Sequence, residues 1–136
     1  YEIKFEEIDV DIYVPYYSRL ALPIEEIKSH ATKIENIQVA SPEVLLILKQ
    51  GAELDREDSV KGSKDRIDIM ALLLFSEIDF KKYNYLLEKH KLKHYSDRLF
   101  SIISNFDDIK YINLNPREFK LKKRELLRNL GKKNKK

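Results

Sequence analysis

The chain has 136 residues with 43% hydrophobic content, which fits one domain with its own core and argues against disorder. It contains no cysteine, which excludes disulfides and thiol chemistry, and no signal peptide or run of roughly 18 apolar residues, so we expect a soluble, cytoplasmic protein without membrane contact. The net charge of +3 is small for the whole chain but unevenly distributed.

Residues 1–14 alternate between apolar and polar side chains, which predicts extended structure with a hairpin or bulge around Glu6-Glu7. Because this pattern begins at the first residue, we expect the chain to be part of a longer protein, although a missing short tail explains the pattern equally well. A short helix is predicted from Pro23, and a short extended segment over residues 34–39.

Carboxylates share one face of the first extended segment. A period of two places Glu7, Asp9 and Asp11 on the same side of the strand. Two such carboxylates can bind Mg²⁺ together with substrate phosphates. For an isolated Asp-x-Asp pair, however, a solvated strand face is the more common explanation.

A helix start is clear at Ser41-Pro42-Glu43, and this helix is predicted to reach about Leu54. Apolar residues nearly surround it, so we expect it to be buried and Lys49 to need a partner. A charged loop over 55–64 is predicted to precede a second apolar helix, on which Asp65 and Asp68 share a face. Lys49 can pair with either aspartate as a structural contact, or bind nucleotide phosphates beside them.

The loop offers further charges and caps. Its cations can form a rim that receives phosphate, although a solvated loop explains them as well, and Ser63 is a candidate cap for the helix that follows. The cations concerned are Arg56, Lys61, Lys64 and Arg66.

Three more helices are predicted: from Asp79 to about His90, from near Ser96, and from Pro116 to about Gly131. The expected fold is therefore α+β, with a small mixed or antiparallel N-terminal sheet packed on helices and a helical C-terminal bundle.

Positive charge concentrates at the C-terminal end. Residues 117–136 carry ten Lys or Arg against two Glu, a net charge of +8, which leaves −5 for residues 1–116. This tail predicts contact with a polyanion such as nucleic acid, and a solubilising terminus is an equally good explanation. The candidate nucleic-acid contacts are Lys120, Lys122, Lys123, Arg124 and Arg128.

Taken in order, these pieces resemble minimal nucleotidyltransferase-fold proteins, including the AbiEii-type toxins of abortive-infection (toxin–antitoxin) systems. The matching pattern is a Ser-Pro-Glu start leading to a lysine (residues 41–49), a charged loop, and then Lys-Asp-x-x-Asp (residues 64–68) before further apolar residues. The strand at residues 8–12 is similar to the third acidic strand of that family. The resemblance covers about residues 8–75.

The resemblance implies roles for particular residues. Asp9 and Asp11 would be candidates for the metal-associated catalytic carboxylate of the third acidic strand. Asp65 would be the catalytic acid of the last motif. Lys49 would contact nucleotide phosphates, with Lys64 and Asp68 beside it. Residues 1–75 would then be the C-terminal part of a nucleotidyltransferase core, 76–131 a helical appendage, and 132–136 a basic disordered tail.

The implied activity is Mg²⁺-dependent transfer of a nucleoside monophosphate from an NTP to a hydroxyl of RNA (for example tRNA), protein or a small molecule. An antitoxin-like protein is an implied partner. The sequence departs from the family where a Gly-Gly or Gly-Ser turn should precede the first Asp-x-Asp, because no glycine precedes Asp9. Either that turn is lost upstream of Asp9 or, as the distance from Asp11 to Ser41 favours, the whole first motif is missing.

On either account we expect this chain to be inactive by itself. The alternative function is a non-catalytic helical module that contacts nucleic acid or a partner protein through its basic C-terminal helix.

Overall fold

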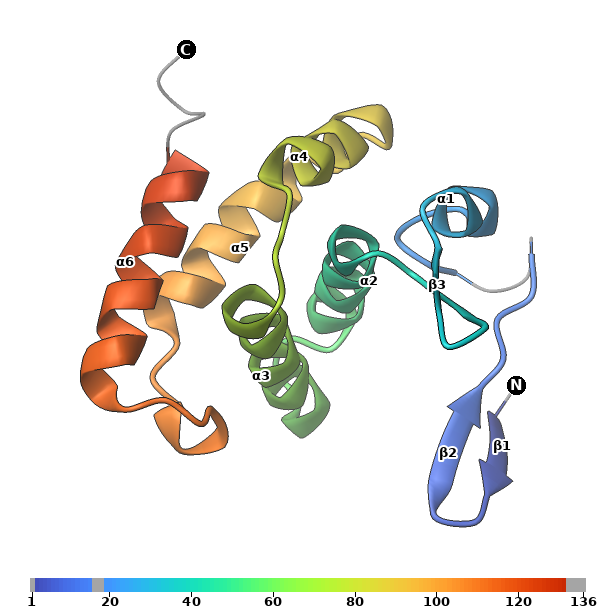
Figure 1. Cartoon of the computed structure of the whole chain (residues 1–136), viewed down its shortest axis with the longest axis horizontal. Coiled ribbons are helices and arrows are strands. Elements are labelled where there is room, and N and C mark those ends of the chain that lie inside the picture. The colour runs from blue at the N-terminus through green and yellow to red at the C-terminus, as the bar shows by residue number, and fades with distance from the viewer. Residues whose placement is uncertain (1, 16–18, 132–136) are drawn as a thin grey trace.

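The computed structural model describes residues 2–15 and 19–131 and is mostly helical, with two small two-stranded sheets in its N-terminal part (Figure 1). The predicted α+β class is confirmed. The strands form two separate antiparallel hairpins, and the helices from Pro42 onward form the main body of the molecule (Figure 1). Residues 132–136, predicted as a tail, lie outside the described residues.

The first hairpin pairs β1 (Glu2–Phe5) with β2 (Ile8–Asp11), and the predicted turn at Glu6-Glu7 is confirmed. The second pairs β3 (Thr32–Ile34) with β4 (Ile37–Val39). Its two turn residues both have positive φ, 48° at Glu35 and 67° at Asn36, as a two-residue hairpin turn of type I′ requires. The first hairpin projects from the helical body (Figure 1).

Helix α1 (Ile24–Ser29) is tied to a later helix by one carboxylate. Glu26 Oε2 lies 2.8 Å from Lys89 Nζ and 3.3 Å from His90 Nε2, and Glu26 Oε1 lies 3.0 Å from His30 Nε2. The hydrogen bond from Lys89, with that of His30 and the nearby His90 ring, outweighs the desolvation of the carboxylate and lowers the pKa of Glu26 from 4.5 to about 2. This contact therefore helps to hold α1 against the helical body.

Helix α2 (Pro42–Asp55) is the central element of the body, and its predicted start and burial are both confirmed (Figure 1). Ser41 Oγ accepts a hydrogen bond from the amide of Val44 at 3.4 Å, and Pro42 occupies the first turn. No residue over 41–54 is exposed. The apolar pattern all around this helix thus matches its place between other helices.

Helix α3 (Val60–Phe75) begins earlier than predicted, so the expected loop over 55–64 is wrong. Ser59, and not Ser63, provides the cap, because Ser59 Oγ accepts from the amide of Gly62 at 3.1 Å. A Cβ at Gly62 would lie 2.3 Å from the carbonyl oxygen of Arg56. Glycine therefore permits the tight turn between α2 and α3. The charged residues of this segment had predicted a longer loop.

The remaining helices follow the predictions closely. Helix α4 (Phe80–Lys89) is capped by Asp79, whose Oδ1 accepts from the amides of Lys81 and Lys82. Helix α5 (His94–Asn105) begins two residues before the predicted Ser96. A short 3₁₀ turn, η1 (Ile109–Tyr111), precedes α6 (Pro116–Gly131), whose bounds are as predicted.

One hydrophobic cluster joins the helices of the body. It combines residues of α2 and α3 with residues of α4, α5 and α6, so the core extends across the predicted boundary between residues 75 and 76. At its centre, the buried amide of Gln50 accepts a hydrogen bond from Tyr83 Oη at 2.6 Å and donates one to the carbonyl of Tyr95 at 2.8 Å. Among the described helices, none has the length and apolar character needed to cross a membrane.

Candidate functional site

Helices α2 and α3 bring together the lysine and the two aspartates that the sequence singled out. Lys49 Nζ lies 2.7 Å from Asp68 Oδ2 and 3.9 Å from Asp65 Oδ1. The side chains of Lys49 and Asp68 are 40% and 51% exposed, whereas that of Asp65 is only 2% exposed. The group therefore combines a buried carboxylate, that of Asp65, with an ion pair between Lys49 and Asp68 that solvent can reach.

Arg56 completes this group, although the sequence indicated it only as one of several loop cations. Its Nε and Nη2 donate to the two carboxylate oxygens of Asp65 at 2.6 and 2.8 Å, a bidentate arrangement that fixes the guanidinium. The bond to Asp65 is the main reason that the pKa of Arg56 is raised, with smaller contributions from the charges of Tyr13 and Asp11. Asp11, the last residue of β2, is therefore near enough to Arg56 for its charge to act on the guanidinium. We call Lys49, Arg56, Asp65 and Asp68 the α2–α3 charge cluster.

The acidic strand is only partly characterised. Asp11 is exposed at the end of β2, and its register partner is Glu2. The backbone of Asp9 is paired with Lys4, but the Asp9 side chain lies outside the described part of the structure. Glu7 belongs to the turn and not to the strand, so the prediction that it shares the strand face is wrong.

A metal site is not assembled from the described side chains alone: these contain no group of three or more His, Asp or Glu able to hold an ion. The donor chemistry still suits a hard cation, because carboxylates are the ligands that Mg²⁺ prefers. Asp65 and Asp68, however, are both occupied by cations of the chain. Asp11 is a described carboxylate whose charge acts on Arg56 of the cluster.

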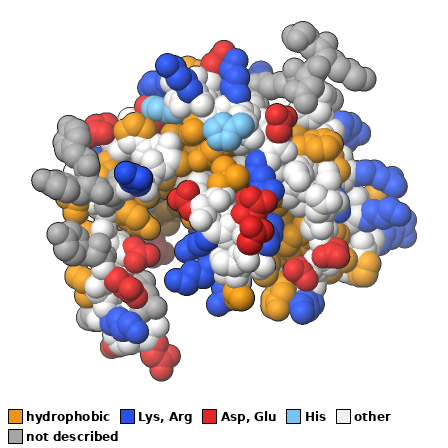
Figure 2. All heavy atoms as spheres, turned by 180° about the vertical axis from the view of Figure 1, so that it is seen from behind, with side chains coloured by type: hydrophobic (Ala, Val, Ile, Leu, Met, Phe, Trp, Pro, Cys, Tyr) orange, Lys and Arg blue, Asp and Glu red, His pale blue; other side chains and the backbone are white. Residues whose placement is uncertain are grey.

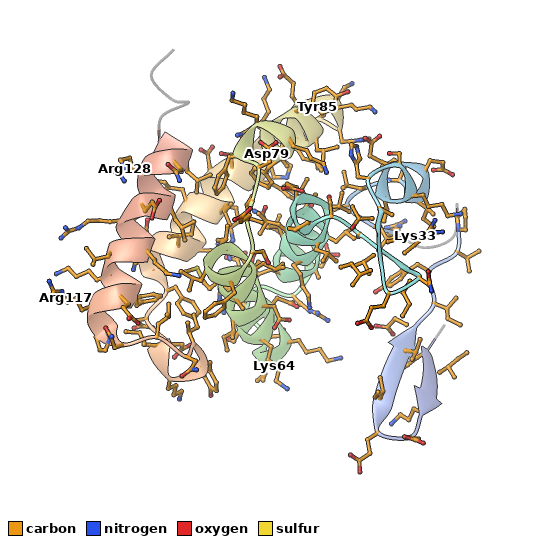
Figure 3. All side chains as sticks on the ribbon, viewed as in Figure 1. Lys33, Lys64, Asp79, Tyr85, Arg117 and Arg128 are labelled. Carbon is orange, nitrogen blue, oxygen red and sulfur yellow. The ribbon has the colours of Figure 1, made fainter. Side chains whose placement is uncertain are left out.

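The predicted rim of loop cations is not formed as a unit. Lys61 and Lys64 are exposed, and Figure 3 shows Lys64 near the outer end of α3. Arg66 lies on a different side of this helix, where its Nη1 donates to Glu53 Oε1 at 2.8 Å. Of the four predicted cations, Arg56 alone joins the α2–α3 charge cluster.

A second ionic group was missed by the sequence analysis. Glu53 is fully buried on α2, and its carboxylate accepts hydrogen bonds from Arg66 of α3 and from Arg98 of α5. Burial raises the pKa of Glu53, but the two guanidinium groups outweigh it and the net shift is downward. A glutamate within an apolar helix is a signal that a buried partner exists, but its spacing does not say which arginine provides it.

The structure divides the predicted nucleic-acid contacts of α6 into two kinds. Lys123 Nζ donates to the carbonyl oxygens of Ser104 and Phe106 at 2.8 and 3.2 Å, and Lys122 Nζ lies 3.4 Å from the carbonyl oxygen of Leu74. These two lysines thereby satisfy carbonyls at the C-terminal ends of α5 and α3. Lys120, Arg124 and Arg128 are exposed.

Comparison of this chain with protein-family models, with curated proteins and with solved structures found no match.

Proposed function

We propose that this chain supplies the phosphate-binding part of a Mg²⁺-dependent nucleotidyltransferase that transfers NMP from an NTP to a hydroxyl of RNA, protein or a small molecule. The observation that supports it best is the α2–α3 charge cluster. Lys49 of α2 and Arg56 at its C-terminal cap meet Asp65 and Asp68 of α3 there, and the charge of Asp11 at the end of β2 acts on Arg56.

The cluster has the properties that a phosphate site needs. Arg56 is held rigidly by Asp65, so it presents a fixed positive charge whose side chain remains 40% exposed. Lys49 is balanced by the half-exposed Asp68, which can turn to solvent when a phosphate takes its place. Exchange of one exposed partner for another costs little, because an exposed ion pair is worth only about 0–1 kcal/mol.

The reaction that such a site serves is a simple displacement. The acceptor hydroxyl oxygen forms a bond to the α-phosphorus and releases its proton to solvent, the bond from this phosphorus to the bridging oxygen breaks, and pyrophosphate leaves. In this proposal Lys49 and Arg56 bind the phosphates of the nucleotide, and Asp65 orients Arg56. Mg²⁺, when bound, offsets the negative charge of the phosphates, with Asp9 and Asp11 as its protein ligands.

The proposal limits what the isolated chain does. Residues 1–8 contain no glycine turn to grip the triphosphate, so we propose that this polypeptide binds nucleotide but does not transfer it. A cytoplasmic location and an antitoxin-like protein partner belong to the same proposal.

Nucleotide binding by this chain is the direct test. Each of the four NTPs is titrated with Mg²⁺ into ¹⁵N-labelled protein, and shifts are expected at the amides of α2 and α3 around the charge cluster. Lys49→Ala is expected to abolish them, whereas the exposed Lys33→Ala on β3 is the control and should bind as the wild type does. If no NTP shifts these amides, or if Lys49→Ala binds equally well, the cluster is a structural ion-pair group and the proposed function is wrong.

Transfer itself is tested on the product of the whole reading frame. Incubation with α-³²P-labelled NTPs and total RNA is expected to label an acceptor, and Lys49→Ala in the same protein should abolish the label. If no acceptor becomes labelled with any of the NTPs, the proposed transferase activity is wrong, even if the protein binds nucleotide.

A further inference from the structure

The outward face of α6 carries a row of four cations. Arg117, Lys120, Arg124 and Arg128 are all exposed, and at about 100° per residue they fall within an arc of about 80°. Figure 3 shows Arg117 and Arg128 on the side of α6 away from the other helices, and Figure 2 shows basic side chains gathered along the same edge of the molecule. We call these four residues the α6 basic row.

The row is held facing solvent by the opposite side of the helix. Phe119, Leu126 and Leu130 are buried in the core, and Lys122 and Lys123 reach carbonyls of neighbouring helices. The orientation of α6 is therefore fixed. Arg117 belongs to the row although the sequence analysis left it out, whereas Lys122 and Lys123 do not.

The positive charge of the row is not neutralised within the described part of the chain. None of its four side chains makes an ion pair or hydrogen bond with another described residue. The two acids of α6 lie on one flank of the helix, and Glu118 is engaged in its N-terminal cap, where it exchanges hydrogen bonds with Asn115. Four cations on one face of α6, with no partner among the residues that the structure describes, generate a local positive potential.

We propose that the α6 basic row binds the phosphate backbone of a nucleic acid. The row extends over eleven residue steps, about 16 Å of helix, and so presents several cations along one line to a linear polyanion. Three of the four are arginines, whose guanidinium groups bind phosphate oxygens in a bidentate way.

Other anionic partners fit this surface less well. A bilayer-bound helix inserts an apolar face, but that of α6 is buried in the core, and Leu121, 55% exposed, is the one large apolar side chain of α6 that the structure leaves open. A protein interface has an apolar or aromatic centre. The exposed face of α6 lacks one, because the large apolar residues of this helix, Leu121 apart, are buried or half-buried. The inference does not depend on nucleotide transfer, since it uses a different surface.

Salt dependence gives the inference a quantitative form. When four phosphates of single-stranded RNA are neutralised, a plot of log K against log[salt] has a slope of about −3. The slope for a DNA duplex is slightly steeper. The lysines of residues 132–136 add to the total slope of the wild type. The difference between the wild type and a variant that lacks the row removes this background, because the tail is the same in both.

The test compares two variants of equal net charge. One replaces the row: Arg117→Gln, Lys120→Gln, Arg124→Gln and Arg128→Gln. The matched control replaces four exposed lysines elsewhere: Lys28→Gln, Lys33→Gln, Lys61→Gln and Lys81→Gln. Fluorescence anisotropy follows binding of a labelled single-stranded RNA, and separately a DNA duplex, between about 50 and 200 mM salt. Thermal melting by circular dichroism verifies that both variants are folded.

We expect the row variant to flatten the slope by about 3 and the control variant by less than about 1. Equal losses in the two variants would mean that net charge alone attracts the nucleic acid, which overturns the inference. Unchanged binding by the row variant overturns it as well. Tighter binding to vesicles rich in phosphatidylserine than to either nucleic acid would identify a membrane surface instead.

Discussion

Replacement of Gln50 tests how the helices of the body are held in register. Its buried side-chain amide links three helices, since it accepts from Tyr83 of α4 and donates to the carbonyl of Tyr95 of α5. Both Gln50 and Tyr83 have 0% exposure, so water cannot replace a lost partner. Burial is also the main reason that the pKa of Tyr83 is raised.

The magnitudes follow from which groups stay unpaired. Gln50→Leu leaves the Tyr83 hydroxyl buried without an acceptor and is expected to lower the free energy of unfolding by about 2–4 kcal/mol. Tyr83→Phe leaves one amide oxygen unpaired, at a cost of about 1–2 kcal/mol. The double variant leaves neither group of this pair unsatisfied, so its loss should be smaller than the sum of the single losses by about 1–2 kcal/mol.

Urea denaturation of the four proteins at pH 7 measures this coupling. A shared m value is needed, so that the three differences refer to the same unfolding transition. Additive losses, with a coupling below about 0.5 kcal/mol, would show that the two side chains do not act on each other and would refute the reasoning.

Two further predictions concern local features. Gly62→Ala is expected to destabilise the protein by about 2–4 kcal/mol because its Cβ would meet the Arg56 carbonyl. Gly131→Ala, whose Cβ would contact no other side chain among the described residues, should be neutral or slightly stabilising. Thermal melting that ranks the two variants the other way rules out this account of the turn. The pKa of Glu26 is lowered to about 2, so its stabilising effect is present above pH 4.5 and is lost as the pH falls toward 2. Glu26→Gln should therefore lower the free energy of unfolding by about 1–2 kcal/mol at pH 7, a value reduced because Lys89 is partly exposed. Near pH 2 the variant and the wild type should be equally stable. A difference in urea midpoint that does not change with pH contradicts this prediction.

Local signals in the sequence predicted most helix limits correctly. Ser41-Pro42, Asp79 and Pro116 are start signals that act within one turn of the helix, and each lies at a helix start in the structure. The first hairpin was likewise predicted from alternation. The start of α3 was not, because Ser59 and Gly62 act together with a close approach of backbone that only the folded turn contains.

The charged residues show the same division more sharply. The sequence by itself determined that Lys49 needed a partner on the next helix, since the cost of an unpaired cation on a buried helix follows from composition and periodicity. Tertiary structure alone decided that Arg56 joins Asp65, that Arg66 and Arg98 share Glu53, and that the cations of α6 separate into anchoring lysines and an exposed row. The physical reason is that a long side chain reaches several partners with similar energy, and packing of distant helices selects among them.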